Sequence, residues 1–144
     1  MTDYAFTCPT STFSSAISAA GRQPVWRYQY SGYFPNLQPF PNGRAYHSSE
    51  IPLVYGTYPL DNQFGQVTQD EIELSKYMQG AWSSFAKNPS GSPGWPKLGS
   101  NNGVELGQLG SKKKPNGEVT EPLLSADAAC VILDPVIIAS GGAY

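Results

Sequence analysis

The stretch NGRAYHSSEIPLVYG, residues 42–56, contains the only histidine of the chain, His47. An imidazole has an ordinary pKa close to neutral pH, so it can take up and return a proton under physiological conditions. The chemistry that such a residue could do is general acid–base catalysis. A lone histidine is, however, more often a structural or surface residue than a catalytic one. The elements around His47 and any family pattern have to distinguish these roles.

The clearest of these elements is a helix over residues 68–87. Thr68 and Glu71 form a T-x-x-E capping box at its start, and Pro89 prevents it from continuing. One apolar stripe runs along it, made of Leu74, Tyr77, Met78, Ala81, Trp82 and Phe85. We expect this helix to dock on a hydrophobic core.

A second helix and a strand are predicted upstream of His47. The helix covers residues 8–21, where Gly21 can end it. Its apolar residues at helical spacing are Phe13, Ala16, Ile17 and Ala20. The strand covers residues 25–31, which are rich in aromatic side chains and valine, and Tyr28 and Tyr30 would share one of its faces.

The remainder of the chain is rich in turn residues. VELGQLG could form a short hairpin arm before SKKKPNG, whose lysine triplet is more typical of a solvated turn than of a binding site. ACVILDPVII, residues 129–138, is apolar enough to be buried as a helix or a strand. One strand candidate and two or three helices are too few for a self-contained α/β domain. The chain therefore looks like part of something larger.

Composition narrows the classes of partner and compartment. A formal net charge of −2 and 14% charged residues argue against a nucleic-acid partner. No run of 18 apolar residues predicts a membrane span, and the N-terminus does not have the pattern of a signal peptide. Two cysteines and one histidine are too few for a zinc site, and we expect no metal or cofactor. From the residues alone, Cys8 and Cys130 could equally be free thiols or one long-range disulfide.

Four blocks occur in a fixed order along the chain: FTCP, PVWRYQYSGYFPN, AYHSSEIPLVYGTYP, and YMQGAWSSFAKNPSG followed by GWP. With these blocks the chain resembles the C-terminal third of type-B carboxylesterases, the family of fungal esterases and lipases and of the cholinesterases. Residues 1–144 would be the C-terminal part of that domain, with a strong match over 1–96 and a weaker, loop-rich tail over 97–144. The fold class implied is α/β: a C-terminal fragment of an α/β-hydrolase fold, with one or two sheet strands and packing helices, incomplete on its own.

The resemblance gives His47 a role. The family has a Ser–Glu/Asp–His triad, with the histidine in a loop reading H-x-x-E-I before a short helix, and residues 47–51 match that loop. His47 would then be the general base. The family places its acid on an earlier loop, so Glu50 would anchor the histidine loop. Tyr46 and Ser49 could line the alcohol side of the pocket, although packing or solvent exposure would explain them equally well.

Two triad members are missing from these residues. No G-x-S-x-G occurs, because SGSPGW has Ser90 where glycine is required, and no H-G-G-G run is present for an oxyanion hole. Chain order puts the nucleophile and the acid upstream of Met1, so we expect the chain alone to be inactive. Cholinesterase-like members join the Cys-Pro segment to a cysteine near the C-terminus, so the resemblance favours a disulfide between Cys8 and Cys130.

The function implied is therefore that of a serine esterase or lipase acting on a small-molecule carboxylic ester, with the missing N-terminal part of the hydrolase domain as partner. The resemblance also suggests a secreted, extracellular protein. The alternatives are a non-catalytic, cholinesterase-like interaction protein or a truncated remnant without activity. A weaker one is an independent, aromatic-rich ligand-binding module.

Overall fold

A computed structural model describes residues 3–60, 65–99 and 105–133 of the chain. The chain divides into two compact units: unit 1 is residues 1–27, 96–106 and 121–144, and unit 2 is residues 28–95 and 107–120. The helices are the π-helix η1 (Asp3–Thr7), α1 (Cys8–Ala20), the 3₁₀-helices η2 (Pro35–Leu37) and η3 (Tyr58–Leu60), α2 (Ile51–Tyr55), α3 (Gln69–Lys87) and α4 (Leu123–Asp127). The strands are β1 (Tyr28–Tyr30), β2 (Glu105–Ser111) and β3 (Lys114–Pro122).

The main element of unit 1 is α1, which agrees with the helix predicted near the N-terminus. It ends at Gly21, whose φ of 65° is in the left-handed region that favours glycine. The predicted inward face is wrong, because Phe13 is 70% exposed while Cys8 and Ser14 are buried. The buried face of α1 is thus determined by a disulfide and by polar contacts rather than by the apolar residues of the helix.

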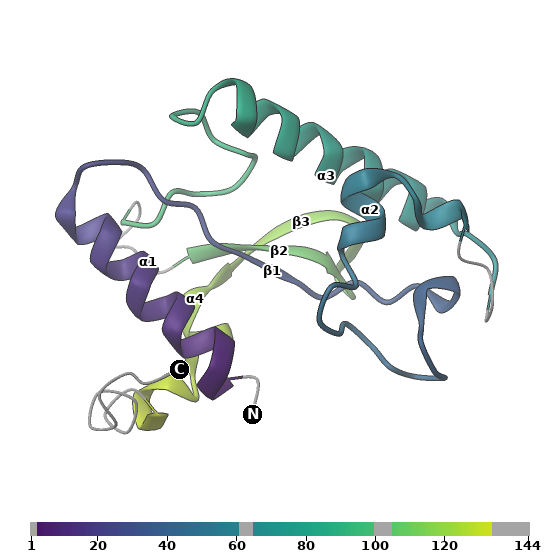
Figure 1. Cartoon of the computed structure of the whole chain (residues 1–144), viewed down its shortest axis with the longest axis horizontal. Helices are drawn as coiled ribbons and strands as arrows, with labels where there is room; N and C mark the ends of the chain where they lie inside the picture. The colour runs from purple at the N-terminus through teal and green to yellow at the C-terminus, as the bar shows by residue number, and fades with distance from the viewer. Residues whose placement is uncertain (1–2, 61–64, 100–104, 134–144) are drawn as a thin grey trace. The chain divides into compact units, whose positions relative to one another are not determined.

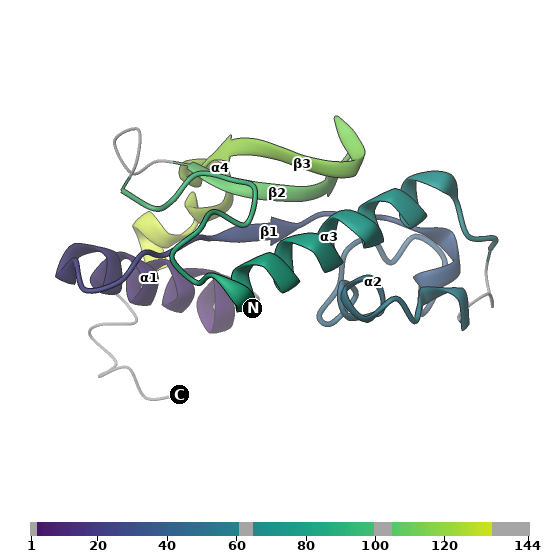
Figure 2. The same cartoon turned by 90° about the horizontal axis from the view of Figure 1, so that it is seen from above.

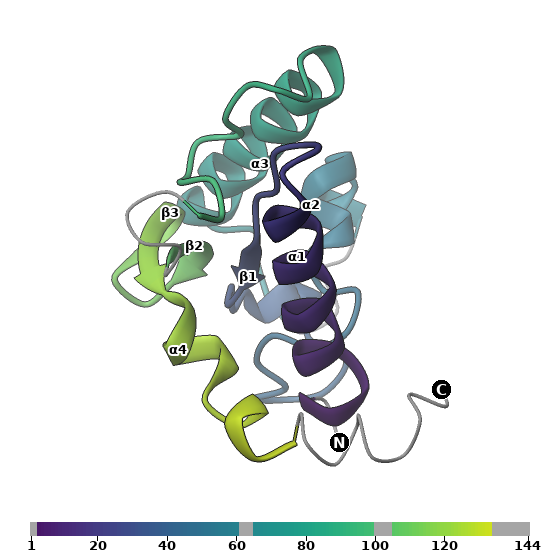
Figure 3. The same cartoon turned by 90° about the vertical axis from the view of Figure 1, so that its left-hand side faces the viewer.

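A disulfide and an ion pair close unit 1. Cys8 is bonded to Cys130 across a sequence separation of 122, which is the pairing that the resemblance implied. Arg27 donates to both carboxylate oxygens of Asp127, at 2.6 and 2.9 Å, and the hydroxyl of Ser11 donates to Asp127 at 2.7 Å. Figure 3 shows residues 128–133, which follow α4, near the N-terminal end of α1. The disulfide joins these two segments. These links join residues that are 100 or more positions apart in the sequence.

The sheet is centred in unit 2 and has the order β1-β2-β3. β1 is parallel to β2, with Tyr28 opposite Gly107 and Tyr30 opposite Leu109. β2 and β3 form the hairpin expected around the lysine triplet (Figure 1). The expectation of one or two strands was therefore too low, because β2 contains glycines and few β-branched residues and gives a weak strand signal. A mixed sheet with packing helices is compatible with a partial α/β-hydrolase fold.

Figure 2 shows α3 running alongside the sheet. Side chains of α3 pack against the strands of the sheet in the core of unit 2. The predicted capping box is confirmed, since Thr68 accepts from the Glu71 N–H and Glu71 accepts from the Thr68 N–H. Leu74 on α3 is fully buried, and Gly110 on β2 approaches it so closely that a Cβ at this glycine would lie 2.8 Å from the leucine. The buried apolar side chains of unit 2 are Phe34, Leu37, Leu53, Leu74, Met78, Ala81, Trp95 and Leu109.

Trp82 and Trp95 join Tyr28 in an aromatic cluster beside this core. The rings of Tyr28 and Trp82 meet edge to face at 5.1 Å, and Trp95 lies over Gly107, where a Cβ would come within 2.6 Å of the indole. Tyr28 remains 41% exposed, so it is less buried than a core residue of a central strand would be.

The last predicted element lies partly outside the described residues. Residues 130–133 are helical, and residues 134–138 are outside the described ranges. Among the described residues, none of the helices combines the length and the apolarity that crossing a membrane requires.

Candidate active site

His47 lies in unit 2, on a turn over residues 47–50 that leads directly into α2. Its side chain is exposed. The imidazole Nδ1 is 2.9 Å from the hydroxyl oxygen of Ser48, and which of the two donates depends on the tautomer. The only imidazole of the chain is therefore held at the surface of its unit, with one ring nitrogen engaged by its neighbour.

Ser49 and Tyr46 hold this turn in place. Ser49 is only 3% exposed, and its N–H and hydroxyl both donate to the carbonyl oxygen of Tyr46, at 3.0 and 2.7 Å. The Tyr46 N–H donates back to the Ser49 hydroxyl at 3.1 Å. The Tyr46 phenol donates to the carbonyl oxygen of Leu37 at 2.7 Å. Both side chains thus fix the backbone on either side of His47.

The helix that follows the turn is pinned to the long helix. The main-chain oxygen of Glu50 accepts from the N–H groups of Leu53 and Val54, both at 3.1 Å, and so starts α2. Leu53 and Ser75 are fully buried, and the Ser75 hydroxyl on α3 donates to the Leu53 carbonyl at 2.7 Å. Because α3 is long and well packed, it gives the histidine turn a rigid support.

The charge of Glu50 acts on the tyrosines of β1. Burial raises the pKa of the Tyr30 phenol, and the negative charges of Glu71 and Glu50 raise it further. The pKa of Tyr28 is raised by burial and then by Glu50. Both phenols therefore remain protonated at neutral pH. Glu50 has a main-chain role in starting α2 and an electrostatic one toward β1.

Three residues around His47 have left-handed backbone conformations that side chains other than glycine rarely adopt. They are Asn42 at φ 64°, Arg44 at φ 57° and Ser48 at φ 74°. Such conformations persist where the surrounding contacts fix them, and they are common at functional sites. Ser48 and Arg44 were not among the site residues predicted from the sequence. The signal available was the Asn42-Gly43 pair, which favours turns with positive φ.

The structure also limits what else the site could hold. Both cysteines are consumed by the disulfide. In the part of the chain that is described, no three side chains of metal-ligating type gather in one place. The turn itself supplies the His47 imidazole, two serine hydroxyls and the Glu50 carboxylate.

A model described as "Carboxylesterase family" matches residues 1–125. The chain belongs to the carboxylesterase family. Among the relatives of this carboxylesterase-family chain, a chlorogenic acid esterase of Aspergillus niger is 43% identical over 69 residues, which is 48% of this chain and 13% of that protein. Secreted lipase 5 of Gibberella zeae is 35% identical over 91 residues, covering 61% of this chain and 16% of the lipase.

The para-nitrobenzyl esterase of Bacillus subtilis is 36% identical over 94 residues, covering 62% of this chain and 18% of the esterase. The chain thus spans less than a fifth of the length of these carboxylesterase relatives. The match over residues 1–125 covers most of the chain and shows the family.

Proposed function

We propose that the chain is the C-terminal part of a serine carboxylesterase or lipase domain and that His47 is the general base of its catalytic triad. The observation that carries the proposal is the turn itself. The only imidazole of the chain is exposed on a turn whose buried anchor, Ser49, and whose following helix are fixed by hydrogen bonds. A base that must reach a nucleophile on another segment needs this combination of exposure and rigid support.

In the proposed reaction, a serine supplied by the rest of the domain attacks the carbonyl carbon of a small carboxylic ester. His47 accepts the serine proton on Nε2 as the serine oxygen bonds to the carbonyl carbon, and it then gives that proton to the departing alkoxide. Water repeats the sequence on the acyl-enzyme, releasing the carboxylic acid and restoring the serine. Backbone donors outside this chain stabilise the oxyanion.

The triad acid would pair with Nδ1 of His47, which is the nitrogen that Ser48 engages at 2.9 Å. When the acid is present, its carboxylate would replace or share the Ser48 hydroxyl at this nitrogen. Glu50 is not proposed as the acid. Its main-chain oxygen starts α2, and its side chain raises the pKa of tyrosines on β1.

The rest of the hydrolase domain is the proposed partner of residues 1–144. β1 is hydrogen-bonded to β2 on one edge, and its other edge is the proposed site at which a strand of the upstream part pairs. We infer further that the protein folds in an oxidising compartment, because a disulfide between Cys8 and Cys130 persists there and rarely in a reducing cytosol. The secretion stated in the name of the Gibberella zeae lipase supports the same location.

The function can be tested in a chimera in which this chain replaces the aligned segment of the Bacillus subtilis para-nitrobenzyl esterase. That segment is 36% identical to this chain over 94 residues, which makes this esterase a suitable host. We expect hydrolysis of a p-nitrophenyl ester, and we expect His47→Gln to lower kcat/KM at least about a thousandfold, because triad members act as a unit.

The control variant is Glu50→Gln, which should retain activity within about tenfold, because a residue that only supports the loop contributes less than the base itself. A folded chimera whose activity is unchanged by His47→Gln would contradict the proposal. An equal loss in the Glu50 variant would instead identify Glu50 as the acid.

A second candidate function is that of a non-catalytic interaction protein or an inactive remnant of the family. The observation that favours it is that these 144 residues contain no G-x-S-x-G. Reading the genomic DNA upstream of the Met1 codon separates the two: an in-frame G-x-S-x-G and an acid loop favour the esterase, and a disrupted frame favours the remnant.

A further inference from the structure

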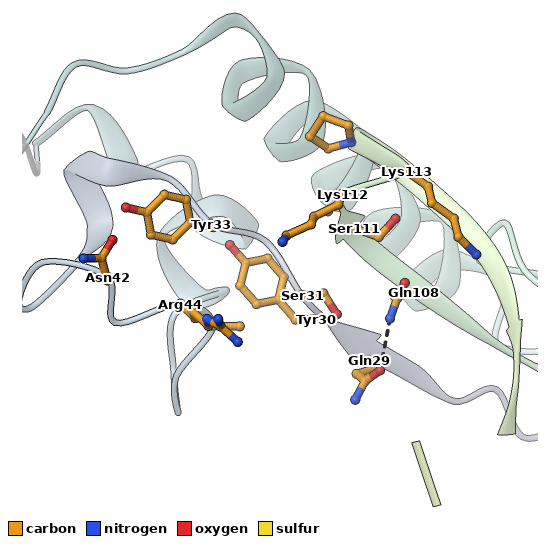
Figure 4. A pocket seen from close by; sticks show the side chains of 13 residues that line it. Gln29, Tyr30, Ser31, Tyr33, Asn42, Arg44, Gln108, Ser111, Lys112 and Lys113 are labelled. Atoms are coloured by element: carbon orange, nitrogen blue, oxygen red, sulfur yellow. Dashed lines mark hydrogen bonds between the residues drawn. The ribbon is translucent and has the colours of Figure 1, made fainter. Parts of the chain in front are cut away.

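A hollow of about 940 Å³ lies within unit 2, beside β1 and the turn between β2 and β3 (Figure 4). One wall is formed by the loop that precedes the histidine turn, and it includes Asn42 and Arg44. The opposite wall is formed by the hairpin turn and includes Lys112 and Lys113. His47 is not among the lining residues, although Ala45, two residues before it, is.

The charge of the lining is all of one sign. Three cations, Arg44, Lys112 and Lys113, line the hollow, and its lining includes no carboxylate. The chain as a whole has a formal net charge of −2, so this local excess of positive charge does not follow from its composition. Cations that share one hollow repel one another, and a bound anion removes that repulsion.

Lys114, the third lysine of the triplet, does not line the hollow. Lys114 lies close enough to Glu118 to lower the pKa of that carboxyl, although burial raises it more strongly. The triplet therefore divides into Lys112 and Lys113, which line the hollow, and Lys114, which does not. This division is unlike a uniformly solvated turn, and it supplies a matched control.

Neutral donors complete the lining. Tyr30, whose phenol is protonated at neutral pH, lines the hollow together with the cations. Gln108 donates to the side-chain oxygen of Gln29 at 3.3 Å, and this bond leaves the NH₂ group of Gln29 as a further donor. The exposed ring of Tyr33 offers an apolar face for the organic part of a ligand. Asn42 and Arg44 are held there in left-handed backbone conformations.

We propose that this hollow is a binding site for a small organic anion, whose carboxylate or phosphate group is held by Arg44 and Lys112. A guanidinium can bind two oxygens of such a group side by side, and an ammonium adds a point charge. The geometry requires no catalytic step at this site. The site is independent of the role of His47.

The test is an NMR titration of the ¹⁵N-labelled chain with inorganic phosphate in one arm and benzoate in the other, at an ionic strength held constant with sodium chloride. We expect saturable shifts of the amides of Arg44, Lys112 and Lys113 with at least one anion. Saturation by phosphate alone identifies a phosphate ligand, and saturation by benzoate identifies an aromatic carboxylate.

The double variant Arg44→Gln with Lys112→Gln should weaken binding by about tenfold or more, since it removes two charge-assisted contacts. Both side chains are exposed, so the fold is not at risk. Lys114→Gln, which removes the same charge from the same turn, should change the affinity by less than about twofold. Shifts that do not saturate, equal weakening in both variants, or a spectrum without dispersed amides would overturn the proposal.

Discussion

The interactions that stabilise unit 1 internally differ from those that stabilise unit 2. In the described residues, the buried apolar side chains of unit 1 are few: Leu98 and Leu106 besides the two bonded cysteines. Its distant segments are joined by the disulfide and by the ion pair of Arg27 and Asp127. Unit 2, by contrast, buries a larger set of apolar side chains, which includes Leu74 and Met78 on α3 and Leu109 on β2.

The difference bears on function, because the histidine turn belongs to unit 2. A turn supported by a packed core keeps its geometry whatever the redox state of the surroundings. A unit closed by a disulfide depends on that state. We therefore expect changes to the cross-links to act on unit 1 and changes to the core to act on unit 2.

The largest effect is expected on removing the disulfide with Cys8→Ser and Cys130→Ser. A loop closed over 122 residues stabilises by about 4 to 5 kcal/mol in the chain-entropy model. Denaturant titration should show this loss as a lower free energy of unfolding, and unit 1 should unfold at a lower denaturant concentration than unit 2. Free-thiol titration of denatured, secreted protein provides the check on pairing: two free thiols would contradict it.

Next in size is Leu74→Ala in the core of unit 2, which should cost about 2 to 5 kcal/mol because it leaves a cavity between α3 and β2. The fluorescence of Trp82 and Trp95 reports on this unit. The exposed Leu60, at 82% exposure, is the control, and Leu60→Ala should stay within about 0.5 kcal/mol. Equal effects at both positions would mean that α3 does not dock as described.

A smaller loss is expected from Arg27→Met in unit 1. It removes both hydrogen bonds to Asp127 and should cost about 1 to 3 kcal/mol, since the carboxylate stays largely buried without its partner. Arg22→Met, at an exposed position of the same unit, should change stability by less than about 0.5 kcal/mol. Urea titration of the two variants measures the contrast.

The smallest effect concerns pH, where the two units should respond with opposite signs. Burial raises the pKa of Asp127, but the hydrogen bonds and charge of Arg27 and the bond from Ser11 outweigh it, so the pKa lies below its ordinary 3.8. This contribution is present above pH 3.8 and is lost as the pH falls through the lowered pKa.

In unit 2, burial raises the pKa of Glu71 above its ordinary 4.5, although the bonds from Asn36 and Thr68 act against it. Its contribution is present below pH 4.5 and is lost as the pH rises through the raised pKa. Acid should thus weaken unit 1 while favouring unit 2, and stability curves of Asp127→Asn and Glu71→Gln between pH 3 and pH 7 would each lose one of the two slopes. Parallel slopes in both variants would contradict the assignment.

Local sequence signals were enough to predict a helix where the residues at its ends mark where it begins or stops. The capping box at Thr68 and Pro89 predicted α3, and Gly21 predicted the end of α1. The sheet was underestimated, because β2 is specified by its long-range pairing with β1 rather than by its own glycine-containing residues. The buried face of α1 could not be predicted either, because it is determined by the disulfide from Cys8 to Cys130, 122 residues away.

At the candidate site, the family pattern singled out His47, and its role remains a proposal. The contacts that hold the turn could not be predicted from the spacing of residues. Ser49 and Tyr46 were equally compatible with a pocket lining, and only the folded chain brings the Tyr46 phenol to the Leu37 carbonyl. Backbone conformations such as that of Ser48 likewise depend on the surrounding fold.

The central claim is that the unit carrying His47 stands on its own apolar core and does not depend on the disulfide. Amide hydrogen exchange of the whole chain, followed by mass spectrometry with and without a reductant, tests this claim most directly. We expect reduction to increase exchange in α1 and α4 while the amides of α3 and of the turn at Ser49 keep their protection. A loss of protection in α3 and at Ser49 equal to that in α1 would contradict the claim.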